Sequence, residues 1–167
     1  KNLVDSEKMM ACLAQGGCVV GAPMDDADVI VINTCGFLAD ARDEAMGVIN
    51  EALACKASGR TARVVVAGCL AQRNGDDLFA QAPGIDAIVG VNDREAILQA
   101  VTGQSKSQVG PYSGAIGSDA GRFRLTPKHV AYLRVAEGCS HNCRFCTIPA
   151  IRGPFRSKPA GDVLAEA

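Results

Sequence analysis

Three closely spaced cysteines in "GCSHNCRFC" (residues 138–146) are the residues of this sequence best suited to chemistry. Three residues separate Cys139 from Cys143, and two separate Cys143 from Cys146. Thiolates bind zinc or iron–sulfur clusters. A structural zinc site takes four protein ligands, and a cubane cluster is normally held by four cysteines. Three cysteines on a [4Fe–4S] cluster would leave one iron open to a substrate or cofactor.

Other interpretations of these three cysteines remain open at this point. His141 could be the fourth ligand of a zinc site, although it lies between two of the cysteines in one short loop. An electron-transfer module of ferredoxin type would need a fourth cysteine, often followed by proline, and no cysteine follows Cys146 in the sequence. The three thiols could also be incidental buried side chains.

A second pair of cysteines directly follows two apolar runs. Cys35 ends "VIVINTC" and Cys69 ends "VVVAGC". Such runs are typical of strands buried on both faces of a parallel sheet, and residues just beyond the ends of these strands share one edge, where ligands bind. We therefore expect these two thiols to approach each other. Asn33 and Thr34, just before Cys35, are expected to cap the next helix or to donate hydrogen bonds to a bound cluster.

Two thiolates make a poor cluster site, so a third ligand is needed. Cys12 is predicted inside a helix, Cys18 at the wrong edge of the sheet, and Cys55 late in a long helix. We interpret these three as ordinary buried or half-buried cysteines.

The elements that would position these cysteines alternate between helix and strand over residues 1–102. The predicted elements are a helix capped by Asp5 or Ser6 and stopped by 16–17, a short strand at 18–20, a strand at 29–32, a helix at 39–59, a strand within 63–72, a helix near 76–81, a strand at 85–91 and a helix at 92–101. This order predicts an α/β fold with parallel βαβ units.

Two further segments follow this domain. Residues 103–126 are rich in Gly and Ser and have no apolar period, which indicates a linker. Residues 127–167 begin a second domain, with alternation over 130–135 that predicts a strand leading into the cysteine loop, and with the start of a helix at the end.

Composition limits the class of protein. The chain has 167 residues, a net charge of −1 and 48% hydrophobic residues, which argues against a dominant nucleic-acid surface. No apolar run is long enough to span a bilayer, so we expect no membrane partner. The chain has eight cysteines and no secretory signal, which favours a reducing, cytoplasmic setting. Because the first residue is Lys1, we expect residues before it.

The spacing C-x₃-C-x₂-C with Phe145 before the last cysteine resembles the signature of radical S-adenosylmethionine enzymes. The resemblance implies that Cys139, Cys143 and Cys146 hold a [4Fe–4S] cluster at the end of the first strand of a (β/α) barrel, which is truncated here. It also implies that the open iron binds S-adenosyl-L-methionine and that Phe145 packs near its adenine.

Longer blocks narrow the resemblance to the methylthiotransferase family. "EGCSHNCRFCTIPAIRG" and "RSKP" are similar to its block, with Lys158 where that pattern usually has Arg. "KNLVDSE" is similar to its "GC.KN.VDSE". The family then implies an auxiliary [4Fe–4S] cluster on Cys35 and Cys69, with a third ligand two positions before Lys1 on a first strand that is missing here.

The family divides by substrate. "NTCGFLADARDEAM" and "LTPKHVAYLRVAEGC" resemble the branch that methylthiolates the β-carbon of an aspartate in small-subunit ribosomal protein twelve. The alternative branch modifies the 2-position of a tRNA adenosine. Arg152 and Arg156 would contact substrate or cofactor, or lie solvated in a loop.

The resemblance also implies how the whole enzyme works. One S-adenosylmethionine donates a methyl group to sulfur at the auxiliary cluster, and a second yields the radical that abstracts hydrogen from the aspartate. The cofactors carry this chemistry and the protein positions them. We further expect an electron donor of flavodoxin or ferredoxin type, a monomer, and no activity from this segment alone.

Overall fold

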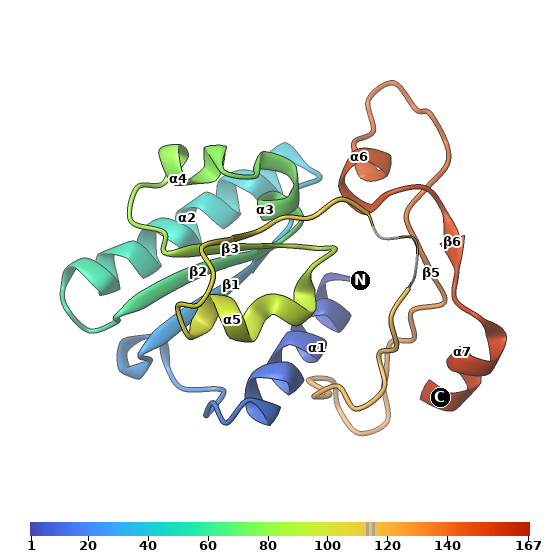
Figure 1. The fold of residues 1–167 in the computed structure, drawn as a ribbon, viewed down its shortest axis with the longest axis horizontal. Coiled ribbons are helices and arrows are strands. Elements are labelled where there is room, and N and C mark those ends of the chain that lie inside the picture. The colour runs from blue at the N-terminus through green and yellow to red at the C-terminus, as the bar shows by residue number, and fades with distance from the viewer. Residues whose placement is uncertain (113, 115) are drawn as a thin grey trace.

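A computed structural model describes residues 1–112, 114 and 116–167; Ser113 and Ala115, both in the range predicted as a linker, lie outside the described residues. The N-terminal part is built on one parallel sheet with strand order β1-β2-β3-β4 (Figure 1). Its strands are β1 (Val29–Thr34), β2 (Arg63–Gly68), β3 (Ala87–Gly90) and β4 (Ser107–Gln108). The predicted α/β fold with a parallel sheet is confirmed.

Helices cover both faces of this sheet, so its strands are buried on both sides. One core joins Val64 and Val66 to α2 (Ala39–Ala57), α3 (Cys69–Asn74) and α4 (Asp77–Gln81). The other joins Val65 and Ala67 to α1 (Asn2–Gln15) and α5 (Ile97–Val101). Successive residues of β2 therefore serve opposite cores, as the two-residue period of a strand requires. Short 3₁₀ turns lie at η1 (Met24–Asp26) and η2 (Arg94–Ala96).

The C-terminal part has little regular structure. It contains β5 (Ala136–Glu137), α6 (Ile148–Arg152), β6 (Arg156–Ser157) and α7 (Ala160–Glu166), and β5 pairs antiparallel with β6. The segment before β5 runs beside α1, where the Phe123 amide donates to the Glu7 carbonyl at 3.1 Å. In Figure 1 this part lies along the side of the sheet domain where the chain begins.

Several predicted elements differ from the observed ones. No strand forms at 18–20, and none forms over 130–135; the two-residue strand β5 follows that range instead and pairs with β6. Within the predicted linker, Ser107–Gln108 instead extends the main sheet as β4. Helix α1 begins at Asn2, so Asp5 lies inside it and is not its cap. None of the helices in the described ranges is long and apolar enough to cross a lipid bilayer.

Candidate functional site

Cys35 and Cys69 lie at the same edge of the main sheet, as predicted. In the pairing of β1 with β2, Thr34 is opposite Gly68, and each cysteine is the next residue in its chain segment. Cys35 is exposed, whereas Cys69, the first residue of α3, is only 9% exposed. The backbone ladder thus fixes where both thiols leave the sheet.

Two glycines allow the loops that carry these cysteines to touch. A Cβ on Gly36 would lie 2.7 Å from the carbonyl carbon of Cys69, and one on Gly68 would lie 2.5 Å from the Asn33 Oδ1. Gly68 also has a φ of 96°, a conformation that favours glycine. Larger residues at either position would force the two cysteine loops apart.

Asn33 and Thr34 do not cap the following helix, whose N-cap position is Leu38. The Asn33 amide donates to the Ser6 hydroxyl at 2.7 Å and to the Asn2 carbonyl at 2.9 Å. The Thr34 hydroxyl donates to the Ala67 carbonyl at 2.6 Å. These bonds join the start of α1 and the two strand ends into one rigid edge. A cavity of about 240 Å³ beside Cys35 extends from this edge to α2, and Asn2 is among its lining residues.

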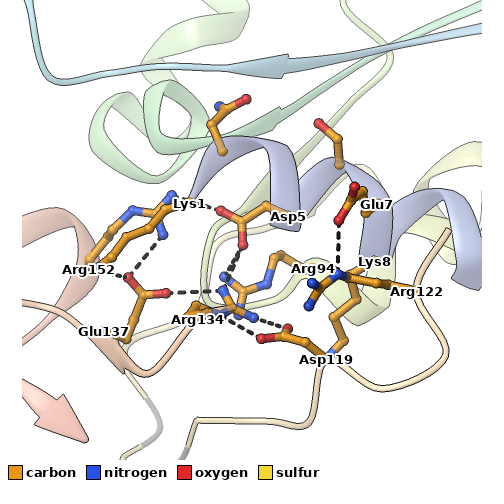
Figure 2. Close-up of polar contacts among 12 residues, drawn as sticks. Lys1, Asp5, Glu7, Lys8, Arg94, Asp119, Arg122, Arg134, Glu137 and Arg152 are labelled. Atoms are coloured by element: carbon orange, nitrogen blue, oxygen red, sulfur yellow. Dashed lines mark hydrogen bonds and ion pairs between the residues drawn. The ribbon is translucent and has the colours of Figure 1, made fainter. Parts of the chain in front are cut away.

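Cys69 is bonded to an arginine from the C-terminal part. The Arg152 Nε donates to the Cys69 Sγ at 3.2 Å. Its Nη2 bonds an Asp5 carboxylate oxygen at 2.8 Å and its Nη1 bonds Glu137 at 3.0 Å (Figure 2). Burial raises the pKa of the Cys69 thiol, and the neighbouring Arg152 opposes that rise. Arg152 is itself buried, so it is not a solvated loop residue.

Asp5 and its partners form a buried ionic cluster, defined here as Asp5, Arg94, Asp119, Arg134, Glu137 and Arg152. The Arg134 side chain is 1% exposed and contacts Asp5 at 2.8 Å, Glu137 at 3.1 Å and both oxygens of Asp119. Arg94 reaches Asp5 at 3.0 Å (Figure 2). Buried charges are tolerated when they are paired in this way.

The pKa values of this cluster follow from its pairing. Burial alone would raise the pKa of Glu137, but the charges of Arg152, Lys1 and Arg134 lower it to about 2. Asp119 is also desolvated, yet hydrogen bonds from Arg134 and Lys158 lower its pKa. Both carboxylates are therefore ionised at neutral pH, as their arginine partners require.

Further ion pairs lie around the buried ionic cluster. Glu7 of α1 pairs with Arg122 at 2.9 Å and accepts the Leu125 amide at 2.8 Å. Lys158, which stands where the resembled pattern usually has Arg, is buried between Asp119 at 2.9 Å and Glu166 at 2.7 Å. Helix α1 is thus the platform on which residues 119–158 are held.

The loop cysteines are arranged differently. The Cys139 amide donates to the Gly153 carbonyl at 3.1 Å, and the Cys146 amide to the Cys143 carbonyl at 3.0 Å. Cys143 is exposed, whereas Cys139 and Cys146 are half-buried. Within the described residues, no three His, Cys, Asp or Glu side chains converge as a metal site would require. The ligand roles of all five cysteines therefore stay predictions.

The remaining predicted positions have simple surroundings. Phe145 is 85% exposed beside the loop cysteines, so its ring is accessible to a ligand. Cys12 and Cys18 pack against the core between α1 and the sheet. Cys55 is a buried residue of α2 and belongs to the core on the other face of the sheet. The last three match the interpretation as ordinary packed cysteines.

Sequence reasoning missed the buried ionic cluster. The sequence patterns place Asp5 at the start of a helix, and the alternating run over 130–135 includes Arg134. One signal was present: a charged residue in an otherwise apolar alternating run needs a partner when that run is buried. Besides the nearby Glu137, the partners of Arg134 are Asp5, 129 positions earlier, and Asp119, and no local pattern predicts these two pairings.

Comparisons with known proteins give one family match and several relatives. Residues 1–90 match the family described as uncharacterized protein family UPF0004. Over its whole length the chain is 42% identical to the ribosomal protein uS12 methylthiotransferase RimO of Elusimicrobium minutum (strain Pei191), and the match covers 39% of that protein. The identity to the protein of that name from Pelotomaculum thermopropionicum is 42%, with 38% of that protein covered. The identity to the one from Koribacter versatilis is 38%, with 42% of that protein covered. The chain therefore spans about two fifths of the length of these relatives.

Proposed function

The chain belongs to the UPF0004 family. From its cysteine pattern and the names of its relatives, we propose that it is part of a radical S-adenosylmethionine methylthiotransferase acting on an aspartate of ribosomal protein uS12. The relatives that match over the whole chain carry that name. The proposed domains are a methylthiotransferase α/β domain over residues 1–102, a linker over 103–126, and the start of a radical S-adenosylmethionine barrel over 127–167.

The observation that carries the proposal is the placement of Cys35 and Cys69 at adjacent strand ends. A thiolate pair on a rigid, glycine-lined edge suits an iron–sulfur cluster, because iron prefers thiolate ligands and the two loops already touch. Asn2 lies against Thr34, with its amide 3.4 Å from the Thr34 carbonyl, so a cysteine just before Lys1 would reach the same edge. The auxiliary cluster would therefore be held by Cys35, Cys69 and that third ligand.

Cys139, Cys143 and Cys146 would hold the second cluster. Their loop is closed at its base by the bond from Cys139 to Gly153, and its tip is exposed, so the thiolates are free to converge on iron. When bound, this cluster and S-adenosylmethionine supply a carbon-centred radical, and the auxiliary cluster supplies the methylthio group. The Phe145 ring, which is exposed, would pack near the adenine.

The rest of the proposal concerns partners. The substrate is ribosomal protein uS12 in the cytoplasm, and the protein acts as a monomer with a flavodoxin or ferredoxin as electron donor. Residues 1–167 alone are inactive, because relatives that carry out the reaction by name are more than twice as long.

The experiment uses a full-length protein that contains this chain, reconstituted with iron and sulfide. Iron per chain is counted for the unchanged protein, for Cys69→Ala and for Cys143→Ala. We expect iron for two clusters, loss of about half of it in each variant, and a methylthio mass on uS12 that disappears in both. Cys12→Ala, a half-buried cysteine of α1, is the matched control and should keep both clusters.

Three results would contradict the proposal. They are iron for one cluster only, zinc in place of iron, and a methylthio mass on tRNA with none on uS12. A methylthio mass on tRNA alone would assign the protein to the tRNA-modifying branch.

A further inference from the structure

The Arg152 side chain links the surroundings of both cysteine sets through hydrogen bonds. Its Nε donates to Cys69, a predicted ligand of the auxiliary cluster, and its Nη1 bonds Glu137. Glu137 lies two positions before Cys139, the first of the loop cysteines. A single guanidinium therefore spans the sheet edge and the base of the loop.

The three nitrogens of this guanidinium have three different partners. Nε serves Cys69, Nη2 serves Asp5 and Nη1 serves Glu137, at 3.2, 2.8 and 3.0 Å. A lysine carries the same charge, but its single ammonium cannot present a planar fork to three separated acceptors. Two carboxylates thus hold Arg152 in place, and the third nitrogen is directed at sulfur.

We propose that Arg152 is a positioning residue that donates a hydrogen bond to the Cys69 thiolate of the auxiliary cluster and raises the reduction potential of that cluster. This inference rests on the proposed function, since it needs a cluster on Cys69. It goes further by assigning to Arg152 a role that concerns the electronic state of the auxiliary site.

The physical basis is electrostatic. A cluster gains one negative charge on reduction, and a buried positive charge or a hydrogen bond to a ligand sulfur favours the more negative state. Arg152 supplies both from a site where few waters screen it, because it is 7% exposed. Removing it should stabilise the oxidised cluster relative to the reduced one.

The test isolates the auxiliary cluster in the full-length protein by replacing the three loop cysteines (Cys139→Ala, Cys143→Ala, Cys146→Ala). The remaining cluster is titrated with dithionite, and the reduced fraction is followed by electron paramagnetic resonance. For Arg152→Met we expect the ratio of reduced to oxidised cluster at a given poise to fall about tenfold, which is about 59 mV for a one-electron couple. Arg152→Lys should shift the ratio less, because it keeps the charge.

Arg94→Met is the matched control. Arg94 pairs with the same Asp5 carboxylate, and in the described part of the chain no hydrogen bond links it to a cysteine. Its replacement removes a positive charge from the same ionic cluster but keeps the bond from Arg152 to Cys69, so it should lower the potential less than Arg152→Met does. If Arg152→Met does not fold, the double variant Arg152→Met with Asp5→Asn removes one of the two carboxylates that lose a partner, and it is titrated in its place.

The outcomes separate the two proposals. If the cluster is intact and Arg152→Met leaves its potential unchanged, as does Arg94→Met, the role of Arg152 is overturned and the proposed function stands. Equal shifts in both variants would also overturn it, since the effect would then be general to the ionic cluster. No iron at the auxiliary site of the loop-cysteine variant with Arg152 intact would instead overturn the proposed function.

Discussion

The two sets of cysteines are held by different kinds of interaction. Cys35 and Cys69 leave a parallel sheet whose backbone hydrogen bonds and glycine contacts set their positions. The loop that carries Cys139, Cys143 and Cys146 has only two-residue strands at its base, and buried ion pairs hold its flanks to α1. The comparison indicates that backbone pairing stabilises the first site, whereas the second depends on the charges of distant side chains.

The largest effect that would test this comparison is expected for Arg134→Met. The change leaves Asp5, Asp119 and Glu137 with fewer positive partners in a buried setting, which typically costs about 3–5 kcal/mol. Hydrogen exchange should show the loss of protection in residues 116–167, with the amides of β1 and β2 much less affected.

The control for Arg134→Met is Glu95→Gln, which removes an ion pair with Lys8 whose glutamate is exposed. Exposed pairs contribute less than about 1 kcal/mol, so exchange should hardly change. Equal losses of protection at the sheet edge and in the loop after Arg134→Met would show that the two sites share one support.

The second prediction concerns pH. The pKa of Glu137 is about 2 in the folded protein against an ordinary 4.5, so its contribution to stability is complete above about pH 4.5. That contribution, on the order of 3 kcal/mol, is lost as the pH falls from about 4.5 to 2. Asp119, whose pKa is also lowered, acts in the same direction. The loop should therefore open in acid before the sheet does.

Proteolysis at pH 3 and pH 7 would measure this difference. Cleavage in residues 138–153 should increase at the lower pH, and Glu137→Gln should reduce the pH dependence of that cleavage. A loop equally resistant at both values would contradict a charge-dependent support.

The smallest effect is expected at the sheet edge. Gly36→Ala places a Cβ against the Cys69 backbone and should destabilise the fold by about 1–3 kcal/mol, because neither backbone can move freely. Gly47→Ala is the matched control: it lies on the exposed side of α2 with open space around it and should stabilise by about 0.5–1 kcal/mol. Thermal unfolding of the two variants compares them directly, and a neutral Gly36→Ala would show that the two cysteine loops are not tightly packed.

Much of the sheet domain was predictable because its signals are local. Apolar runs such as 64–66 and the helical period of 39–57 each lie within one element, and a parallel βαβ order brings strand ends to one edge. The placement of Cys35 beside Cys69 followed from those rules. The strand predicted at 130–135 was wrong because strand formation needs a pairing partner, and alternation alone does not supply one.

The amino-acid sequence by itself determined the α/β architecture, the strand-end position of Cys35 and Cys69, and the spacing of the three loop cysteines. These features depend on periodicity and on neighbours along the chain. Only the tertiary structure decided that Asp5 meets Arg134 and Arg152, and that Arg152 reaches the Cys69 sulfur. Such contacts join residues as many as 147 positions apart, and their geometry depends on how the C-terminal part packs against α1, which no local pattern specifies.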